Sequence, residues 1–292
     1  MVGYDISKKI LYSLIFFIFI TFTVSSCGDS GDKAELDKYA NMLFGIGNTS
    51  TTNAPPTTSP MVYIPAGWFW MGCSPNDNQC KDSEKPYHKV YLDAYYIDLN
   101  DVTVDEYNKC VNAGGCTQPD VNDCLIWNGS SRVKGGSLGA EFQKGNHPVV
   151  CVDWNQANSY CQWAGKRLPT EAEWEKAARG TDGRIYPWGN EWDASKACYN
   201  QSSTCAVGSY PQGASPYGVL DMAGNVWNWC RDWYDANYYA NSPDHNPTGP
   251  DSGSIHVLRG GSFNNLEGMR SSYRSDYYFT NGYDDRGFRC AR

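Results

Sequence analysis

Twelve cysteines in a chain of 292 residues constrain the folding of this protein more than any other feature. In an exported chain so many cysteines are typical of a disulfide framework, not of a metal cluster. The sequence has no Cys-x-x-Cys pair and its four histidines are scattered, so we predict no zinc site. Spacing alone leaves the connectivity open. The candidate short-loop pairs are Cys73 with Cys80, Cys198 with Cys205, and Cys110 with either Cys116 or Cys124.

Residues 1–26 predict an export signal. Lys8 and Lys9 precede an apolar run over residues 10–22, and small residues follow it. The run is shorter than the roughly 20 apolar residues of a membrane span. Its end resembles a bacterial lipobox, which implies cleavage before Cys27 and a lipid on that residue; the alternative is an ordinary signal peptide. With Cys27 lipidated, eleven cysteines remain, so at least one is unpaired or pairs between chains.

Two further segments follow the signal. Residues 27–60 form the lipidated N-terminus and a tether rich in Ser, Thr and Pro, which has almost nothing to bury. Residues 61–292 form a single folded domain. We therefore expect a protein of the bacterial cell envelope, attached to its membrane only through the lipid and placed on the outer surface.

The composition favours a globular, loop-rich domain without a nucleic-acid partner. Hydrophobic residues make up 41% of the chain, and 29 glycines and 15 prolines indicate many turns. The net charge is −8 and the basic residues form no cluster, whereas phosphate binding needs a concentrated basic surface. The expected fold class is α+β with much irregular structure.

Local patterns predict three helices and several strands. Capping boxes at Thr103 and Thr170 predict helices through Val111 and from Thr170 to Gly180, and an Asp153 cap predicts a helix over 155–164. Residues 61–72 read as two strand-like runs joined in a hairpin, and alternation over 88–98 predicts another strand.

The segment from Arg259 to Cys290 is dense in Asn, Ser, Asp and Tyr and poor in aliphatic residues. Such residues give amphipathic contact area and adaptable hydrogen bonds, as in antibody loops, so we interpret the segment as a presented surface. Turns favour the same polar residues, and the alternative is an ordinary loop. Trp227, Trp229 and Trp233 are expected to pack behind this surface.

Motifs spread over the domain are similar to the sulfatase-modifying-factor family, whose founding member is the formylglycine-generating enzyme. They include Ile64–Gly67, Asn146–Val149, Ala164–Glu175, Asp221–Trp227 and Gly287–Cys290, in the family's order. The resemblance covers residues 61–292 and implies a single domain with the C-type-lectin-like variant of that family's fold. It also implies a disulfide between Cys161 and Cys290.

The resemblance puts the family's oxidase chemistry in doubt for this chain. The two copper-binding cysteines of the founding enzyme match Asn265 and Arg270 in this sequence, and copper(I) needs soft thiolate ligands. We therefore expect no copper and no catalytic residues. The family's calcium ligands match Asn200 and Gln201 at one place, and at another Gly224, Val226 and Asn228, where the missing carboxylate at 228 weakens a hard-cation site. Calcium stays an open expectation.

The C-terminal segment also resembles the variable region of retroelement-diversified surface lipoproteins of the same fold. This resemblance implies a variable face for an unknown protein or glycan ligand at the cell surface; an undiversified relative with a polar segment is the alternative. The residues expected to be exposed in the face are Asn264, Asn265, Leu266, Ser272, Tyr273, Ser275, Asp276, Tyr277, Tyr278, Tyr283, Asp284 and Asp285.

The leading hypothesis is a lipid-anchored binding protein. The rivals are an enzyme of the sulfatase-modifying class, an accessory factor that acts on an exported partner, and a structural envelope lipoprotein.

The binding hypothesis makes a direct prediction for two tyrosines. Replacing both Tyr277 and Tyr278 with Ala is expected to abolish ligand capture, because aromatic anchors dominate such contacts. The melting temperature is expected to stay nearly unchanged. A binding assay paired with thermal unfolding tests this, and retained binding would mean that the ligand contacts another surface.

Overall fold

The computed structural model describes residues 59–292 except 129, 136–137, 265 and 279–281, and the side chains of Tyr277 and Tyr278 are also outside it. The predicted export signal, Cys27 and most of the tether therefore lie outside the described residues, as does Asn265. Within the described part of the chain, no helix has the length and hydrophobicity needed to cross a membrane.

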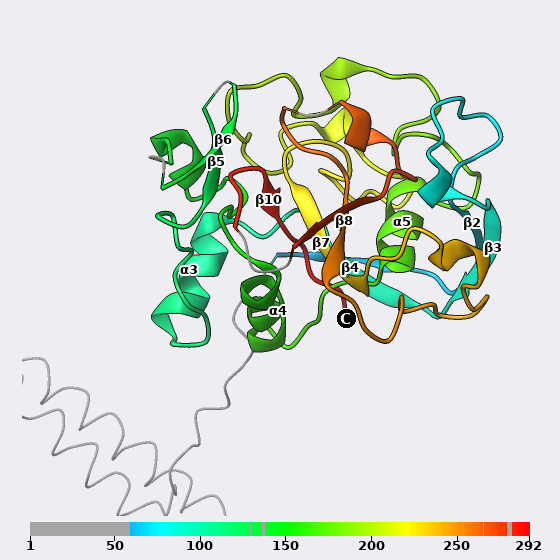
Figure 1. Cartoon of the computed structure of the whole chain (residues 1–292), viewed down its shortest axis with the longest axis horizontal. Coiled ribbons are helices and arrows are strands. Elements are labelled where there is room, and N and C mark those ends of the chain that lie inside the picture. Colours follow the sequence, from blue (N-terminus) through cyan, green and yellow to red (C-terminus); the bar gives the residue numbers. More distant parts are fainter. Residues whose placement is uncertain (1–58, 129, 136–137, 265, 279–281) are drawn as a thin grey trace, which may run out of the picture. The chain divides into compact units, whose positions relative to one another are not determined.

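Short strands and helices are connected by long loops (Figure 1). The helices are α3 (Val104–Asn112), α4 (Trp154–Trp163) and α5 (Glu171–Arg179). The strands are β1 (Met61–Ile64), β2 (Gly67–Met71), β3 (His88–Leu92), β4 (Tyr95–Asp98), β5 (Leu125–Trp127), β6 (Arg132–Lys134), β7 (Trp227–Trp233), β8 (Ile255–Arg259), β9 (Ser275–Tyr278) and β10 (Arg286–Gly287). The predicted α+β class is confirmed.

Each of the three helices begins at the cap predicted from the sequence, and at Asp153 the structure adds a full capping box with Gln156. The side chains of Thr103, Asp153 and Thr170 each accept a hydrogen bond from the backbone N–H three residues later. The side chain at that later position accepts a hydrogen bond from the backbone N–H of the capping residue. These reciprocal bonds satisfy N–H groups that have no partner inside the helix. The predicted helices are confirmed because their starting signals are local.

The predicted hairpin between the first two strands is wrong. β1 pairs with β4 and β2 pairs with β3, both antiparallel, so β1 and β2 form one arm of a longer, bent hairpin whose other arm is β3 and β4. The single strand expected over 88–98 is accordingly two strands. Pro65 lies at the bend between β1 and β2, where it removes a backbone donor from the ladder.

The central sheet has the order β10-β7-β8-β9, and its two faces carry the core. Helix α5 lies between this sheet and the β2–β3 arm (Figure 1), where Trp174 packs with Phe69 and Val257. Helix α4 packs near β7, in a second core cluster that contains Trp227 and Trp229. The sheet, which contains the C-terminal strands β9 and β10, therefore packs against both core clusters.

Five disulfides connect the loops in the described residues. Three predictions are confirmed: Cys73–Cys80, Cys198–Cys205 and the family-implied Cys161–Cys290. The choice left open at Cys110 is settled in favour of Cys116, and Cys124 pairs with Cys151. Cys230 is a buried free thiol.

The long-range disulfide is expected to stabilise the fold more than a short-range one. Cys161 and Cys290 are 129 residues apart, whereas Cys73 and Cys80 are seven apart. A disulfide that closes a larger loop removes more entropy from the unfolded chain. Replacing Cys161 and Cys290 with Ala should therefore lower the free energy of unfolding by about 5 kcal/mol, and replacing Cys73 and Cys80 with Ala should lower it by about 2 kcal/mol. Denaturant unfolding of the two variants tests this, and equal losses would contradict it.

Candidate functional site

The C-terminal segment leaves β8 through Gly260 and Gly261, which both have positive φ. A Cβ on Gly261 would lie 2.9 Å from the backbone of Gly268, and one on Gly268 would lie 2.2 Å from the Trp227 ring. Gly261 and Gly268 are therefore in close contact with each other, and Gly268 lies against the Trp227 ring. This confirms that Trp227 packs behind the segment, where its ring also meets Tyr273 at 5.9 Å.

Arg270 occupies the position matched to a copper-binding cysteine, and its guanidinium is buried between two carboxylates. Its Nη1 donates to Asp77 Oδ2 at 2.6 Å and to Glu84 Oε2 at 2.7 Å, and its Nη2 donates to Glu84 Oε1 at 2.6 Å. Burial alone would lower the pKa of Arg270, but hydrogen bonds and charge from Glu84 and Asp77 raise it above its usual value. The side chain is thus a fixed cation.

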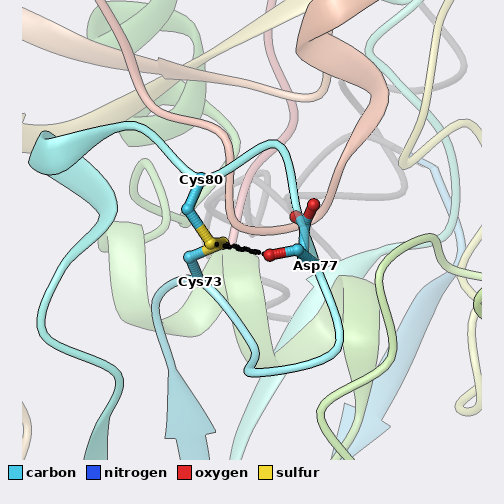
Figure 2. A group of neighbouring side chains, drawn as sticks. All are labelled: Cys73, Asp77 and Cys80. Atoms are coloured by element: carbon cyan, nitrogen blue, oxygen red, sulfur yellow. Dashed lines mark hydrogen bonds between the residues drawn. A yellow bond between two sulfur atoms is a disulfide. The ribbon is translucent and has the colours of Figure 1, made fainter.

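Both carboxylates come from the loop between β2 and β3, which the Cys73–Cys80 disulfide closes (Figure 2). The two sulfur atoms and Asp77 lie close enough to suggest a metal site. The cysteines are bonded to each other, however, and offer no thiolate, while the Asp77 carboxylate already binds Arg270. This group acts as a clamp for Arg270, and its residues do not fit a metal ion.

Two more buried arginines hold the same segment from below. Arg259 donates to the Ser271 carbonyl at 2.6 Å and to Glu175 at 2.6 Å. Arg274 donates to both carboxylate oxygens of Glu171, at 2.6 and 2.9 Å. Burial would raise the pKa of Glu171, but Arg274 and Arg259 lower it below its usual value, so it stays ionised.

Ser272 and Tyr273 are buried, which corrects the prediction that they are exposed in the face. The hydroxyl of Ser272 donates to Glu84 at 2.9 Å. The Tyr273 ring lies between two cations, Lys81 at 4.5 Å and Arg270 at 5.5 Å from its centroid. Both residues are drawn inward because the arginines beside them must reach buried carboxylates.

Tyr283, Asp284 and Asp285 are also buried, and the prediction of exposure is wrong for them too. Asp284 accepts from Trp127 N and from Arg132 Nη1, both at 2.7 Å. Asp285 pairs with the other nitrogen of the same guanidinium, and Arg132 lies 5.1 Å from the Tyr283 ring centroid. These residues connect the C-terminal segment to Arg132 of β6 and do not face solvent.

The described residues of the predicted face that reach solvent are few. Asn264, Leu266 and Asp276 are exposed, and Ser275 is half-buried. Sequence reasoning missed Lys81, which forms an exposed ion pair with Glu267 and donates to the Tyr273 hydroxyl at 2.8 Å. We call Asn264, Leu266, Glu267, Asp276 and Lys81 the exposed rim. The contributions of Asn265 and of the Tyr277 and Tyr278 side chains lie outside the described residues.

Asn228, expected near a calcium ion, has all its polar atoms engaged. Its Oδ1 accepts from Trp174 Nε1 at 3.0 Å and from Arg289 Nε at 2.7 Å. These obligate donors fix the amide, so its Nδ2 faces Asp101 and the Val226 carbonyl, at 2.8 and 3.2 Å. The Asn228 side chain therefore offers calcium no free oxygen, and a calcium ion at Gly224, Val226 and Asn228 stays a prediction that rests on the two backbone carbonyls.

The other predicted calcium set lies elsewhere on the surface. Asn200 and Gln201 are exposed, and the backbone of Asn200 has a φ of 55°. The Gln201 N–H donates to the Phe263 carbonyl at 3.1 Å, which joins this loop to the start of the C-terminal segment. A calcium ion at this set remains a prediction.

The geometry defines a loop-rich α+β domain with the C-type-lectin-like fold of formylglycine-generating enzymes. A solved structure of Treponema denticola variable protein 1 has the same architecture, with a TM-score of 0.63 and 26% identity over 79% of this chain and 94% of that one. The family model described as "Sulfatase-modifying factor enzyme 1-like domain" matches residues 48–292. The chain belongs to this family.

Curated relatives show how widely the domain is used. The formylglycine-generating enzyme of Streptomyces coelicolor is 36% identical over 81% of this chain and 90% of its own length. The serine/threonine-protein kinase pkn1 of Chlamydia caviae is 38% identical over 81% of this chain. The match spans 38% of that kinase's length, so the two proteins share the domain and not the whole chain.

Removal of the Arg270 charge tests the clamp. The Arg270→Met change leaves Asp77 and Glu84 buried without their cation, and we expect a loss of about 3–5 kcal/mol in the free energy of unfolding. The matched control is Lys81→Met, which breaks the exposed ion pair with Glu267 and should cost less than about 1 kcal/mol. Denaturant unfolding compares the two, and similar losses would mean that the clamp does not stabilise the fold.

Proposed function

We propose that this protein is a lipid-anchored member of the family, on the surface of a bacterial cell, whose exposed rim binds a protein or glycan ligand. The observation that carries the proposal is the state of position 270. A thiolate stands there in the copper enzymes that the sequence resembles, whereas here a guanidinium is fixed by Asp77 and Glu84. A cation in this place opposes binding of copper(I).

The rigidity of the segment supports a binding role. Arg259, Arg270 and Arg274 hold the backbone beneath the rim through buried ion pairs. A surface that is already ordered loses little conformational entropy when it binds, so its contacts contribute more fully to affinity. The rim combines one apolar side chain, Leu266, with amide and charged groups, a mixture suited to a polar ligand.

The likeness to Treponema denticola variable protein 1 supports the idea of a frame that tolerates changes on one face. If the same holds here, diversification would concentrate at Asn264, Leu266 and Asp276 and would avoid the buried Tyr283 and Asp284, which hold ion pairs or core contacts. A near-identical adenine-rich repeat beside the gene, with a reverse transcriptase, would support diversification.

The second candidate function is the oxidase chemistry of the sulfatase-modifying class, favoured by the 36% identity to the Streptomyces coelicolor enzyme. Copper titration of the purified protein, with oxygen uptake measured on a cysteine-containing peptide, separates the two. We expect neither copper-dependent oxygen uptake nor conversion of the cysteine. Turnover in this assay would replace the binding proposal with an enzymatic one.

The rim predicts which changes weaken ligand binding. Screening the protein on glycan and extracellular-protein arrays identifies a bound probe, and its affinity is then measured for an Asn264→Ala, Leu266→Ala, Asp276→Ala variant. A loss of about tenfold or more is expected, because removing central contacts costs more than about 1.4 kcal/mol. The control is Val121→Ala, which changes an exposed residue on another loop. Equal affinities of the two variants would exclude the rim.

A further inference from the structure

The outer side of the bent hairpin carries a row of aromatic side chains that the proposed function does not use. Alternate residues of a strand point to opposite faces, and here the inner set is buried while the outer set is aromatic. Four of the rings are strongly exposed: Tyr63 at 53%, Trp68 at 39%, Trp70 at 42% and Tyr96 at 40%. We use the name aromatic strip for the set Tyr63, Trp68, Trp70, Tyr87, Tyr91 and Tyr96.

The rings of the strip meet in pairs across the two arms. Tyr63 and Tyr96 are register partners with ring centroids 5.3 Å apart, and Trp68 and Tyr91 are partners at 5.4 Å. Trp70 stacks on Tyr87 at 5.0 Å. The three pairs follow one another along β1 and β2, so the strip is a series of ring pairs and not a set of isolated residues.

A series of exposed aromatic pairs along one hairpin calls for a contact. Scattered surface hydrophobics are normal, but contiguous ones mark interaction sites. Tyrosine and tryptophan rings are apolar with one polar atom, which suits a boundary between an apolar and a wet phase. The strip is formed by regular strands, so its rings are held in place before any contact.

The charges beside the strip favour an anionic surface. Lys89 lies 4.9 Å from the Trp68 ring centroid, and the Arg292 guanidinium lies 5.7 Å from the Tyr96 ring centroid. Two acids also lie near the strip: Asp93 accepts a hydrogen bond from Asn246 at 3.0 Å, and Asp244 pairs at 2.8 Å with His245, whose ring lies 5.0 Å from the Trp68 ring. Two cations among aromatic rings are notable in a chain with a net charge of −8.

The strip also lies beside the point where the folded domain joins the predicted anchor. The described chain begins at Ser59, and Tyr63 follows within β1. The sequence between Cys27 and this point has about 30 residues, and a tether of the predicted flexible kind would have an end-to-end distance of roughly 30 Å. Among the surfaces of the domain, the one that starts at β1 is thus the closest along the chain to the lipid.

We infer that the aromatic strip lies against the phospholipid headgroups of the membrane that holds the anchor. The inference rests on the proposed lipid anchor. Tryptophan and tyrosine favour the membrane interface, and Lys89 meets lipid phosphates there. The strip would add interfacial contacts to the attachment that the acyl chains provide. The contact would also fix the orientation of the domain.

Tryptophan quenching in vesicles tests this contact. The full-length lipoprotein is inserted through its anchor into phosphatidylcholine vesicles that contain phosphatidylglycerol, with and without brominated phosphatidylcholine, which quenches only nearby tryptophans. We expect quenching in the unaltered protein and a decrease of about twofold or more in a Trp68→Ala, Trp70→Ala variant, because those rings would sit at the interface. The matched control is Trp127→Ala, an equally exposed tryptophan on β5 that should leave the quenching unchanged.

The outcomes separate the strip from the anchor. Labelling of Cys27 with radioactive palmitate, and flotation with the vesicles, report the anchor alone. A labelled, floating protein without bromine quenching overturns the strip inference and leaves the proposed function intact; a strip that binds a polysaccharide or a protein would give this result. Failure of labelling overturns both. Unchanged thermal unfolding of the double variant confirms that it is folded.

Discussion

The fold depends on a set of buried arginines whose charges are neutralised by carboxylates far away in the sequence. Arg259 binds Glu171 and Glu175, and Arg270 binds Glu84, 186 residues before it. A buried charge is costly unless it is paired and fully hydrogen-bonded, so the segment cannot move without exposing or stranding these groups. The ion pairs therefore fix the path of the C-terminal chain. The hydrophobic clusters supply the packing that buries it.

The same interactions distinguish this chain from the copper enzymes that its sequence resembles. In the region that resembles a copper site, the chain places Arg270 instead of a soft ligand, and the disulfide loop around Asp77 supplies the counter-charge. The pocket is thus filled by a structural cation. The surfaces to which we assign function are the exposed rim and the separate aromatic strip on the hairpin.

The sequence predicts this fold where the signals are local and fails where partners are distant. The helix at Thr103 starts with a capping box contained in four residues, so it could be read directly. The burial of Tyr283 and Asp284 depends on Arg132, about 150 residues away, and composition cannot reveal such a partner. Five arginines in the C-terminal block were a usable signal, because arginines in a segment without core aliphatics need acids to pair with.

The disulfide between Cys161 and Cys290 has a consequence for how the protein matures. In an exported chain, as we propose this protein to be, Cys161 would emerge 129 residues ahead of its partner, while Cys124, Cys151 and Cys198 would pass through the same oxidising space. An oxidant that joins thiols in their order of appearance would form a non-native disulfide between Cys161 and another cysteine that emerges before Cys290. Thiol–disulfide exchange must then correct the error, so the yield of this molecule in a cell depends on an isomerase as much as on its own stability.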